Sequence, residues 1–575
     1  MLQKIENDIK QSINELFNIS TDILDKLVIE QPPEKYQNDF DLSTNIALIL
    51  AKSVNKKPIE IANEIADKLA VISKNSQLDY IAEIKILPPA FINIKLKDNI
   101  LLAMVDDVIK NGDKNLVKNL GTSINGMAEK VNVEFCSANP TGPLHIGHAR
   151  GAIFGDVLSS MLEKSGYNVC REYYVNDAGR QMEKLEQSIQ WRIDGCKDTL
   201  PEGCYPGEYL QKIANKRKKI LEKNPSKVWS KTETALEMIQ TFIKPTLKKL
   251  KIDFDIFSSE QKLKDEGAIE NGINRLLELE LIYKGTLEPP KGKPVEDYEP
   301  REQLLFKSTQ FGDDMDRPIA KSDGSHTYFA SDIAYHYDKY KRGFNNMVVV
   351  LGADHKGYVK RLTSAVKAVS NSQAEAHIKL CELVNFMKNG KMVKMSKRKN
   401  NFLTINDVLD EIDPDILRFI ILTRKADTTL NFDLFLAKEQ SRENPIWYIQ
   451  YAHSRCCSAL RQAQNNNEIN NQNNINIDKK LPKEFHSLLI KALFYTRFLE
   501  LAVKNYEPYF FANYLTQLAT SLHSVWAAGN EDKTLRIIQF DSPQVSQQHL
   551  SIVECIKNLL SSGLKIFNIE PMEEM

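Results

Sequence analysis

The chain has 575 residues and zero formal net charge, with 76 Lys+Arg against 76 Asp+Glu, and 42% of its residues are hydrophobic. This composition is typical of a globular protein and excludes a collagenous, coiled-coil or wholly disordered chain. The length exceeds what one hydrophobic core supports, so we expect several domains. No apolar run reaches the roughly 18 residues that a membrane-spanning helix needs. At first sight the balanced charge also disfavours nucleic acid as a partner.

The cysteines and the first residues indicate a compartment. The eight cysteines form no CxxC pair, and no group of Cys and His has the spacing of a zinc site, so we expect no tightly bound metal. Scattered thiols in a long chain are typical of a reducing environment. The first residues mix acids with bases and lack the apolar core of a signal peptide, which predicts a cytoplasmic protein.

Residues 1–120 are predicted to form a small α/β domain. The first 50 residues are acidic, with nine Asp/Glu against four Lys. Residues 91–96 alternate apolar and polar side chains, which is the pattern of a half-buried strand. The polar, glycine-containing stretch 111–125 is typical of a linker to the next domain.

A second, larger domain is predicted at residues 121–400. Residues 131–135 have the pattern of a strand, residues 137–143 form a Pro/Gly-rich loop, and residues 153–162 have apolar side chains at helical spacing. A second strand is predicted at 167–175. Strand, loop, helix and strand in this order open many nucleotide-binding parallel sheets. The sequence therefore predicts a Rossmann-like α/β fold here.

Two further regions complete the predicted organisation. Residues 185–300 are predicted to be a helical insertion, which is basic at 211–250, with eleven Lys/Arg and three Glu. A strand at 347–351 indicates that the sheet resumes after the insertion. The rest of the chain is predicted to be helical: connecting helices at 401–445, broken near Pro414, and a helical domain at 446–575 with an Asn-rich, solvated loop at 465–476.

The first candidate site is His145-Ile146-Gly147-His148, at the predicted loop-to-helix junction. A helix N-terminus offers free N–H groups and partial positive charge, and both suit phosphate. The imidazoles add donors, and Gly147 lets a base or ribose approach the backbone. Two histidines at this spacing are also compatible with a structural or metal-binding role. The position after a strand and before an amphipathic helix favours phosphate.

The second candidate site is the KMSKR motif at residues 394–398. Residues 386–400 hold six Lys/Arg and no acid, and such a run is usually a solvated loop. A loop of cations can also neutralise the charge that builds on a leaving pyrophosphate, which stabilises the transition state electrostatically.

Together the two motifs resemble the signature of class I aminoacyl-tRNA synthetases. Their flanks resemble one family of that class, the bacterial-type arginyl-tRNA synthetases, at residues 134–151 (EFCSANPTGPLHIGHARG), 173–181 (YYVNDAGRQ), 328–336 (YFASDIAYH) and 451–455 (YAHSR). The resemblance covers essentially the whole chain. It implies a multidomain α/β fold: a Rossmann-like catalytic domain with a helical insertion, an N-terminal add-on domain that contacts tRNA, and a C-terminal all-α anticodon-binding domain of the DALR type.

The resemblance also implies an activity. A family member is a ligase that activates L-arginine with ATP and transfers it to the 3′ end of arginine tRNA, releasing AMP and diphosphate. ATP is then a substrate, and we expect Mg²⁺ to accompany it, held mainly by the phosphates. The expected partners are arginine, ATP and arginine tRNA, the expected oligomeric state is a monomer, and arginine activation is expected to require bound tRNA.

Residue roles follow from the same resemblance. The implied catalytic residues are His145, His148, Lys394 and Lys397. The implied ATP site consists of these histidines and Lys397 together with Pro143, Gly147, Gly352, Asp354, Met395 and Ser396.

The chemistry of arginine agrees with a site built around Asp332. A guanidinium is a permanent planar cation whose best protein partner is a carboxylate. Asp332 lies four residues after Tyr328, on the same face of a helix. By resemblance, Asp332 takes the guanidinium and Tyr328 orients it; the alternatives are a surface ion pair for Asp332 and a core position for Tyr328. The polar end of the substrate is expected to contact Ser137, Asn139, Asn176, Gln181 and His148.

Three other functions share some of these features. Shorter nucleotidyltransferases carry an HxGH motif, but they lack a long helical C-terminal domain. Non-catalytic tRNA-binding relatives of synthetases usually lose one of the two motifs, and both are intact here. A class I synthetase for another amino acid is the third alternative.

Overall fold

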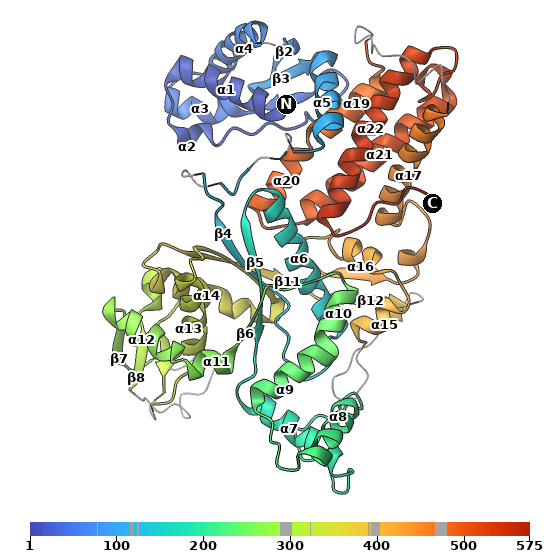
Figure 1. Ribbon diagram of the computed structural model, residues 1–575. Helices are drawn as coiled ribbons and strands as arrows, with labels where there is room; N and C mark the ends of the chain where they lie inside the picture. Colours follow the sequence, from blue (N-terminus) through green and yellow to red (C-terminus); the bar gives the residue numbers. More distant parts are fainter. Residues whose placement is uncertain are drawn as a thin grey trace.

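The computed structural model describes the chain except for residues 77–78, 115–116, 118, 123–125, 288–301, 322–323, 389–390, 393–402 and 466–479. Figure 1 shows an N-terminal body in blue beside a helical C-terminal body in orange and red, with the central body below them. No helix in these described parts is long and apolar enough to cross a membrane.

The N-terminal body is a three-stranded antiparallel sheet packed against helices. Its central strand, β3 (Phe91–Leu96), confirms the strand predicted there and lies between β1 (Leu42–Thr44) and β2 (Ile81–Leu87). Aliphatic side chains such as Ile92, Ile94 and Ile65 are buried in its core. The helices are α1 (Leu2–Phe17), α2 (Thr21–Leu24), α3 (Ile46–Val54), α4 (Pro58–Asn75) and α5 (Asp98–Asn111).

The central body is built on one sheet of five strands in the order β11–β10–β4–β5–β6, and every neighbouring pair is parallel. The three strands predicted in this region are confirmed, and α6 (Ala149–Lys164) connects the first two and packs on the sheet. The strands are β4 (Lys130–Glu134), β5 (Asn168–Val175), β6 (Ile256–Ser259), β10 (Asn346–Gly352) and β11 (Glu375–Cys381).

The segment predicted as a helical insertion, 185–300, contains helices and also strands. The segment begins as helices, but β6 inside it pairs with β5 and so belongs to the central sheet. With four residues, β6 is too short to show a period-2 pattern, which is why the sequence does not reveal it. The helices before β6 are α7 (Arg180–Ile193), α8 (Leu210–Lys223), α9 (Lys231–Met238) and α10 (Lys244–Lys249).

A second lobe follows β6 and contains α13 (Tyr328–Lys341), the helix of the predicted arginine pocket. It has its own small antiparallel sheet, β7 (Ile282–Gly285), β8 (Gln303–Phe306) and β9 (Arg317–Ala320). The other helices here are α11 (Glu260–Asp265), α12 (Ala268–Glu278) and α14 (Val359–Val369).

The connecting segment and the C-terminal body are mainly helical. The break predicted near Pro414 is confirmed: Asp413 Oδ1 accepts the Asp415 N–H at 2.8 Å, and Pro414 is the first residue of α16 (Pro414–Ile421). The connecting segment also contains α15 (Ile405–Leu409) and β14 (Leu430–Asp433), and β14 pairs with β12 (Val384–Lys388), which precedes the segment and also pairs with β13 (Lys391–Met392). The C-terminal helices are α17 (Pro445–Gln464), α19 (Lys483–Leu493), α20 (Tyr495–Lys504), α21 (Tyr509–Glu531) and α22 (Pro543–Ile566).

A fully buried guanidinium joins the central and C-terminal bodies. Arg418 on α16 donates to the carbonyls of Phe567 at 2.8 Å and Leu250 at 2.6 Å, and it pairs with Asp156 on α6 at 2.5 Å. Asp156 also accepts from Asn568 Nδ2 at 3.1 Å. Since a buried charge is tolerated only when its donors are satisfied, this arginine fixes three distant segments relative to one another.

His486 on α19 joins the C-terminal body to the N-terminal body. Its Nδ1 lies 2.7 Å from Asp98 Oδ1, and its Nε2 lies 2.9 Å from Asp41 Oδ1. Asp41 also accepts from Lys95 Nζ at 2.9 Å, and Asp98 accepts the Leu481 N–H at 2.9 Å. Burial lowers the pKa of His486, but hydrogen bonds to the two carboxylates together outweigh burial and raise it.

This bridge predicts a pH-dependent stability. The pKa of folded His486 is raised, so its contribution is complete below the unfolded value of about 6.5 and is lost as the pH rises through the folded pKa. The pKa values of Asp41 and Asp98 are lowered, so their contributions require a pH above about 4. We expect His486→Gln to lower the urea midpoint more at pH 6 than at pH 9.

The matched control is Ser487→Ala, which changes an exposed neighbour on the same helix and should leave the midpoint unchanged at both pH values. A His486→Gln deficit of the same size at pH 6 and pH 9 would contradict a charged bridge.

Candidate active site

The predicted site residues gather at one edge of the central sheet. All five strands are parallel, so their carboxyl ends meet at this edge. The loop after β4 carries Ser137, Asn139 and residues 145–148, Asn176 follows β5, and Gly352 ends β10. Strand direction therefore brings together residues that are far apart in the sequence.

The chain turns sharply as it leaves β4. Cys136 and Ser137 have positive φ angles of 65° and 35°. This conformation costs free energy for any residue with a Cβ and is concentrated at functional sites. The turn lets Ser137 Oγ accept the Tyr174 N–H at 3.1 Å and donate to Glu134 Oε1 at 3.3 Å. Ser137 is thereby fixed between the ends of β4 and β5.

The two histidines lie against each other at the start of α6. A short 3₁₀ turn, Ile146–His148, leads into the helix, and the rings of His145 and His148 stack with their centroids 3.7 Å apart. A Cβ on Gly147 would come within 3.0 Å of the His145 ring, so a larger residue would displace that imidazole. Both imidazoles thus lie at the loop-to-helix junction that the sequence predicts.

Buried Arg150 holds the start of α6 in place. Its guanidinium donates to the carbonyls of Glu382 at 2.9 Å, Thr428 at 2.7 Å and Lys425 at 2.7 Å. These carbonyls belong to the segments around β12 and β14. The helix that carries the histidines is therefore tied directly to the connecting segment.

The segment after the cationic motif pairs with the histidine loop. The Ile146 N–H donates to the Leu403 carbonyl at 3.0 Å, and the Ile405 N–H donates to the Leu144 carbonyl at 3.0 Å. The described residues do not include the motif itself, so four predicted site residues lie outside them: Lys394, Met395, Ser396 and Lys397.

A cluster of carboxylates lies beside the end of β4. Asp332 on α13 interacts electrostatically with Glu134, the last residue of β4, and with Glu260, the first residue of α11. Burial raises the pKa of Asp332 to about 7, and repulsion by Glu134 and Glu260 adds to the rise, while Arg361 opposes it. Near neutral pH, Asp332 is therefore present in both its neutral and its charged form.

Among the described residues, two of these three carboxylates form an ion pair and Asp332 forms none. Lys339 Nζ lies 2.6 Å from Glu134 Oε2, and Lys264 Nζ lies 2.6 Å from Glu260 Oε1. Asp332 has no such ion pair among the described residues, so the predicted alternative of a surface salt bridge is not observed. A cation bound next to Asp332 would form an ion pair with it and favour the ionised form of its carboxyl group.

Glu172 on β5 holds α13 in position beside this cluster. It accepts hydrogen bonds from Tyr335 Oη at 3.0 Å, Asn132 Nδ2 at 2.6 Å and Arg342 Nη2 at 2.9 Å. Burial opposes ionisation, but Lys339 and Arg342 together outweigh it and hold the pKa of Glu172 below its usual value. The charged network keeps α13 and β5 in register beside Asp332.

The remaining predicted ligands lie closer to solvent. Tyr328 is 84% exposed, so a core position for this tyrosine is wrong, and the described residues show no contact between its ring and Asp332. Pro143 and Asn176 are half-buried. The other predicted ligands are exposed: Asn139, Gln181, Gly352 and Asp354.

The described residues contain no group of three or more His, Cys, Asp or Glu that could hold a metal ion.

All eight cysteines lie within the described ranges as free thiols. Burial raises the pKa of Cys136, the cysteine beside the β4 turn, to about 12, so its thiol stays protonated and unreactive at neutral pH.

Comparison with protein families matches the chain in three consecutive parts. Residues 3–96 match the arginyl tRNA synthetase N terminal domain, residues 114–427 match the catalytic domain of class I (R) tRNA synthetases, and residues 449–575 match the DALR anticodon binding domain. The chain belongs to the arginyl-tRNA synthetase family. The family resemblance of its motifs is thereby confirmed.

Similar proteins agree with the family over the whole length. The arginine–tRNA ligase of Wolbachia sp. subsp. Brugia malayi is 43% identical, over 100% of this chain and 98% of that protein. The ligase of Cereibacter sphaeroides (strain ATCC 17029) is 42% identical, over 96% and 95%. The solved arginyl-tRNA synthetase of Thermus thermophilus aligns with a TM-score of 0.73 at 18% identity, covering 100% of both chains. The arginyl-tRNA synthetase of Plasmodium falciparum aligns with a TM-score of 0.69 at 17% identity, over 100% and 99%. The predicted fold class is confirmed.

Sequence reasoning missed several residues that build this arginyl-tRNA synthetase-family site. Glu134 stands inside the recognised motif, but nothing in its neighbours signals that it faces Asp332. Glu260 and Arg361 lie in segments without any motif, and only the fold brings them near α13. Lys339 follows Asp332 by seven residues, two helical turns, and this spacing on one face is the signal that could have identified it.

The buried Glu134–Lys339 pair yields a stability prediction. In Lys339→Met, the Glu134 carboxylate would stay buried without its counter-charge, and we expect the free energy of unfolding to fall by about 3–5 kcal/mol. The urea midpoint, followed by intrinsic fluorescence, measures this change. Lys341→Met is the control, since Lys341 is exposed on the same helix.

The double variant Glu134→Gln/Lys339→Met should recover most of the loss, because it leaves no unpaired charge. A single Lys339→Met variant with the midpoint of the control would show that the pair contributes nothing to stability.

Proposed function

We propose that the chain is an arginine–tRNA ligase, which activates L-arginine with ATP and transfers it to the 3′ end of arginine tRNA. The observation that carries this proposal is the half-buried carboxylate of Asp332, which forms no salt bridge among the described residues and lies in a cluster with Glu134 and Glu260. The family match supports the tRNA partner and the use of ATP.

Arginine supplies the ion-pair partner that Asp332 lacks among the described residues. In the proposed complex the guanidinium pairs with Asp332, and Tyr328 closes over it from the exposed start of α13. The polar end of the substrate then lies near the β4 turn and the end of β5. Its proposed contacts are Ser137, Asn139, Asn176, Gln181 and His148.

Activation takes place at the histidine loop. An oxygen of the arginine carboxylate attacks the α-phosphorus of ATP, and the bond from this phosphorus to the bridging oxygen of pyrophosphate breaks. His145 and His148 donate to phosphate oxygens, where negative charge builds in the transition state. Gly147 and Gly352 let the nucleotide approach the backbone. The other proposed contacts to ATP are Pro143, Asp354, Met395 and Ser396.

Lys394 and Lys397 neutralise the leaving pyrophosphate. Support comes from the pairing of Leu403 with the histidine loop: Leu403 follows Lys397 by six residues, and an extended chain of that length spans at most about 20 Å. Mg²⁺ enters with ATP and is held mainly by its phosphates.

Transfer completes the reaction. A terminal ribose hydroxyl of the tRNA attacks the carbonyl carbon of arginyl-adenylate, and the bond between this carbon and the AMP oxygen breaks, which releases AMP. The N-terminal body (1–120) and the C-terminal helices (446–575) hold the tRNA, and the reaction takes place in the cytoplasm on a monomeric enzyme.

The direct test is ATP–pyrophosphate exchange followed by aminoacylation with each amino acid. We expect arginine alone to support both reactions, and exchange to depend on arginine tRNA. Charging of another amino acid, or no charging in the presence of the tRNA, would contradict the proposal.

The raised pKa of Asp332 predicts how arginine binding depends on pH. A guanidinium binds the ionised carboxylate, so the KM for arginine should fall as the pH rises through about 7, the pKa of Asp332. With that pKa, about a tenth of the carboxylate is ionised at pH 6, and the KM there should be about tenfold above its value at pH 8.

Glu260→Gln removes part of the repulsion and should move the inflection to lower pH. Asp338→Asn, on the same helix but paired with Arg342, is the control and should leave the profile unchanged. A KM for arginine that stays flat between pH 6 and pH 8 would exclude Asp332 as the guanidinium ligand.

A further inference from the structure

Helix α8 of the insertion carries a row of lysines on its exposed face. The helix (Leu210–Lys223) contains six Lys/Arg and a single Glu. Lys212, Lys216, Lys219 and Lys223 follow one another at intervals of four, three and four residues, which places them on one side of the helix. All four are exposed, and the row extends over about 16 Å. We call these four residues the lysine row.

The opposite face of α8 is anchored, so the row has a fixed orientation. Leu210, Ile213 and Ala214 are buried. Arg217, 1% exposed, donates to Glu237 Oε2 at 2.8 Å and to Glu186 Oε2 at 2.9 Å. Because the apolar face is already covered, α8 is not an amphipathic helix that could lie in a membrane surface.

Most of the charge in the row is not neutralised. Nearby cations do have partners: Lys227 pairs with Glu233 at 2.7 Å, and Lys231 pairs with Glu183 at 2.8 Å. Lys216 shares Glu237 with Arg217, at 2.9 Å. The other three lysines of the row have no carboxylate partner among the described residues: Lys212, Lys219 and Lys223.

The row starts beside the phosphate-binding loop. Tyr209, the residue before α8, donates from its hydroxyl to the Thr141 carbonyl at 2.7 Å, four residues ahead of His145. A Cβ on Gly142 would lie 2.9 Å from the Tyr209 hydroxyl, so helix and loop are in close contact. The Tyr209 ring also meets Phe242 edge-on, at 5.6 Å. The positive charge therefore begins at the site and leads away from it along α8.

We propose that the lysine row binds successive phosphates of the acceptor arm of the tRNA and so leads its 3′ end to the histidine loop. The inference rests on the proposed function, since it takes tRNA as the substrate. A row of lysines contacts phosphates without reading bases, and each neutralised phosphate makes binding more sensitive to salt. The acceptor arm is the part of the substrate that must reach the site beside Tyr209.

The test removes the charges and keeps polar side chains that are only one atom shorter. Lys212, Lys219 and Lys223 are changed together to Gln in the full-length protein, and aminoacylation is measured at several salt concentrations. We expect the KM for tRNA to rise at least about tenfold, and the slope of log KM against log salt to fall by about 2 to 3, which is about 0.7 to 0.9 for each lost phosphate contact. The KM for arginine at saturating tRNA should stay unchanged.

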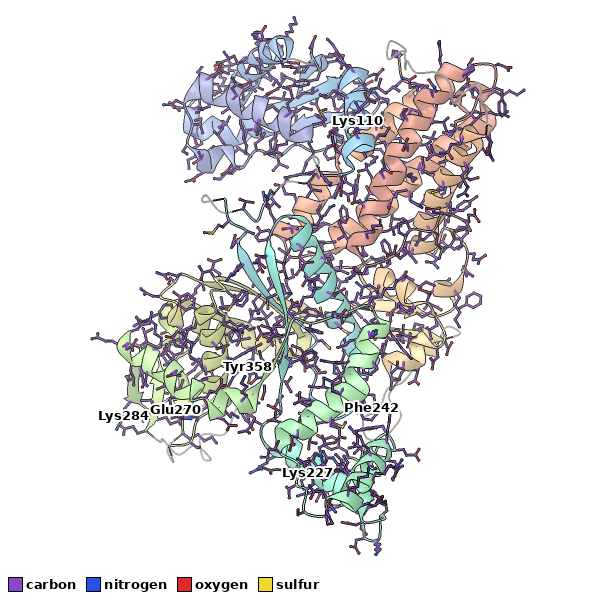
Figure 2. All side chains as sticks on the ribbon, in the orientation of Figure 1. Lys110, Lys227, Phe242, Glu270, Lys284 and Tyr358 are labelled. Atoms are coloured by element: carbon purple, nitrogen blue, oxygen red, sulfur yellow. The ribbon has the colours of Figure 1, made fainter. Side chains whose placement is uncertain are left out.

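Two sets of controls isolate the charge effect. The same change at Lys262, Lys284 and Lys321 places three glutamines on the second lobe, on the other side of the molecule; Figure 2 labels Lys284 there and Phe242 and Lys227 near α8. This control should keep the wild-type KM and slope. Replacing Lys212, Lys219 and Lys223 by Arg keeps the charge and should keep both values as well.

The possible outcomes test the proposed function and the role of the lysine row separately. A wild-type enzyme that does not charge tRNA with arginine overturns the proposed function. A wild-type enzyme that does, together with a Gln variant of unchanged KM and salt slope, overturns only the lysine row. The affinity for a hairpin RNA that copies the acceptor arm should fall in the Gln variant. A loss confined to a hairpin that copies the anticodon arm would overturn the assignment.

Discussion

The direction of five parallel strands is the constraint on which the catalytic centre depends. Because β4, β5, β6 and β10 all run the same way, their carboxyl ends deliver the histidine loop, Asn176, Glu260 and Gly352 to one edge. A strand of opposite direction would send its loop to the far side of the sheet. The insertion and the second lobe also leave from this edge, on either side of β6, so helices from both can reach the same site.

Buried charges hold this arrangement together. Arg418 and Arg150 each donate to carbonyls of segments at least 149 residues away in the chain. Lys339 and Tyr335 on α13 donate to the carboxylates of Glu134 and Glu172 on the sheet. Burying a charge is costly unless its partners are in place, so these networks tolerate only one relative position of the bodies. The same physics explains Asp332: it is the one member of its carboxylate cluster that the described residues leave without an ion pair.

The zero net charge of the chain conceals separate acidic and basic regions. The first 50 residues and the carboxylate cluster around Asp332 are acidic, while α8 is strongly basic and begins beside the loop that leads to the two histidines. The C-terminal helical domain is balanced, with twelve Lys/Arg and twelve Asp/Glu, so we expect its contacts with RNA to depend on shape, stacking and hydrogen bonds more than on bulk charge. Zero net charge limits non-specific attraction of the whole chain to RNA, while the basic surface of α8 still attracts phosphates locally.

By itself the sequence determined the family, the three bodies, the main strands and the histidine loop, because these depend on contiguous motifs and on the local periodicity of β4, β5 and β10. It did not reveal β6, whose four residues are too few to show a period. Only the tertiary structure decided that Glu134 and Glu260 surround Asp332 and raise its pKa, and that Tyr209 joins α8 to the loop. Electrostatic coupling depends on distance in space, and residues 134, 260 and 332 become neighbours only when the parallel sheet forms.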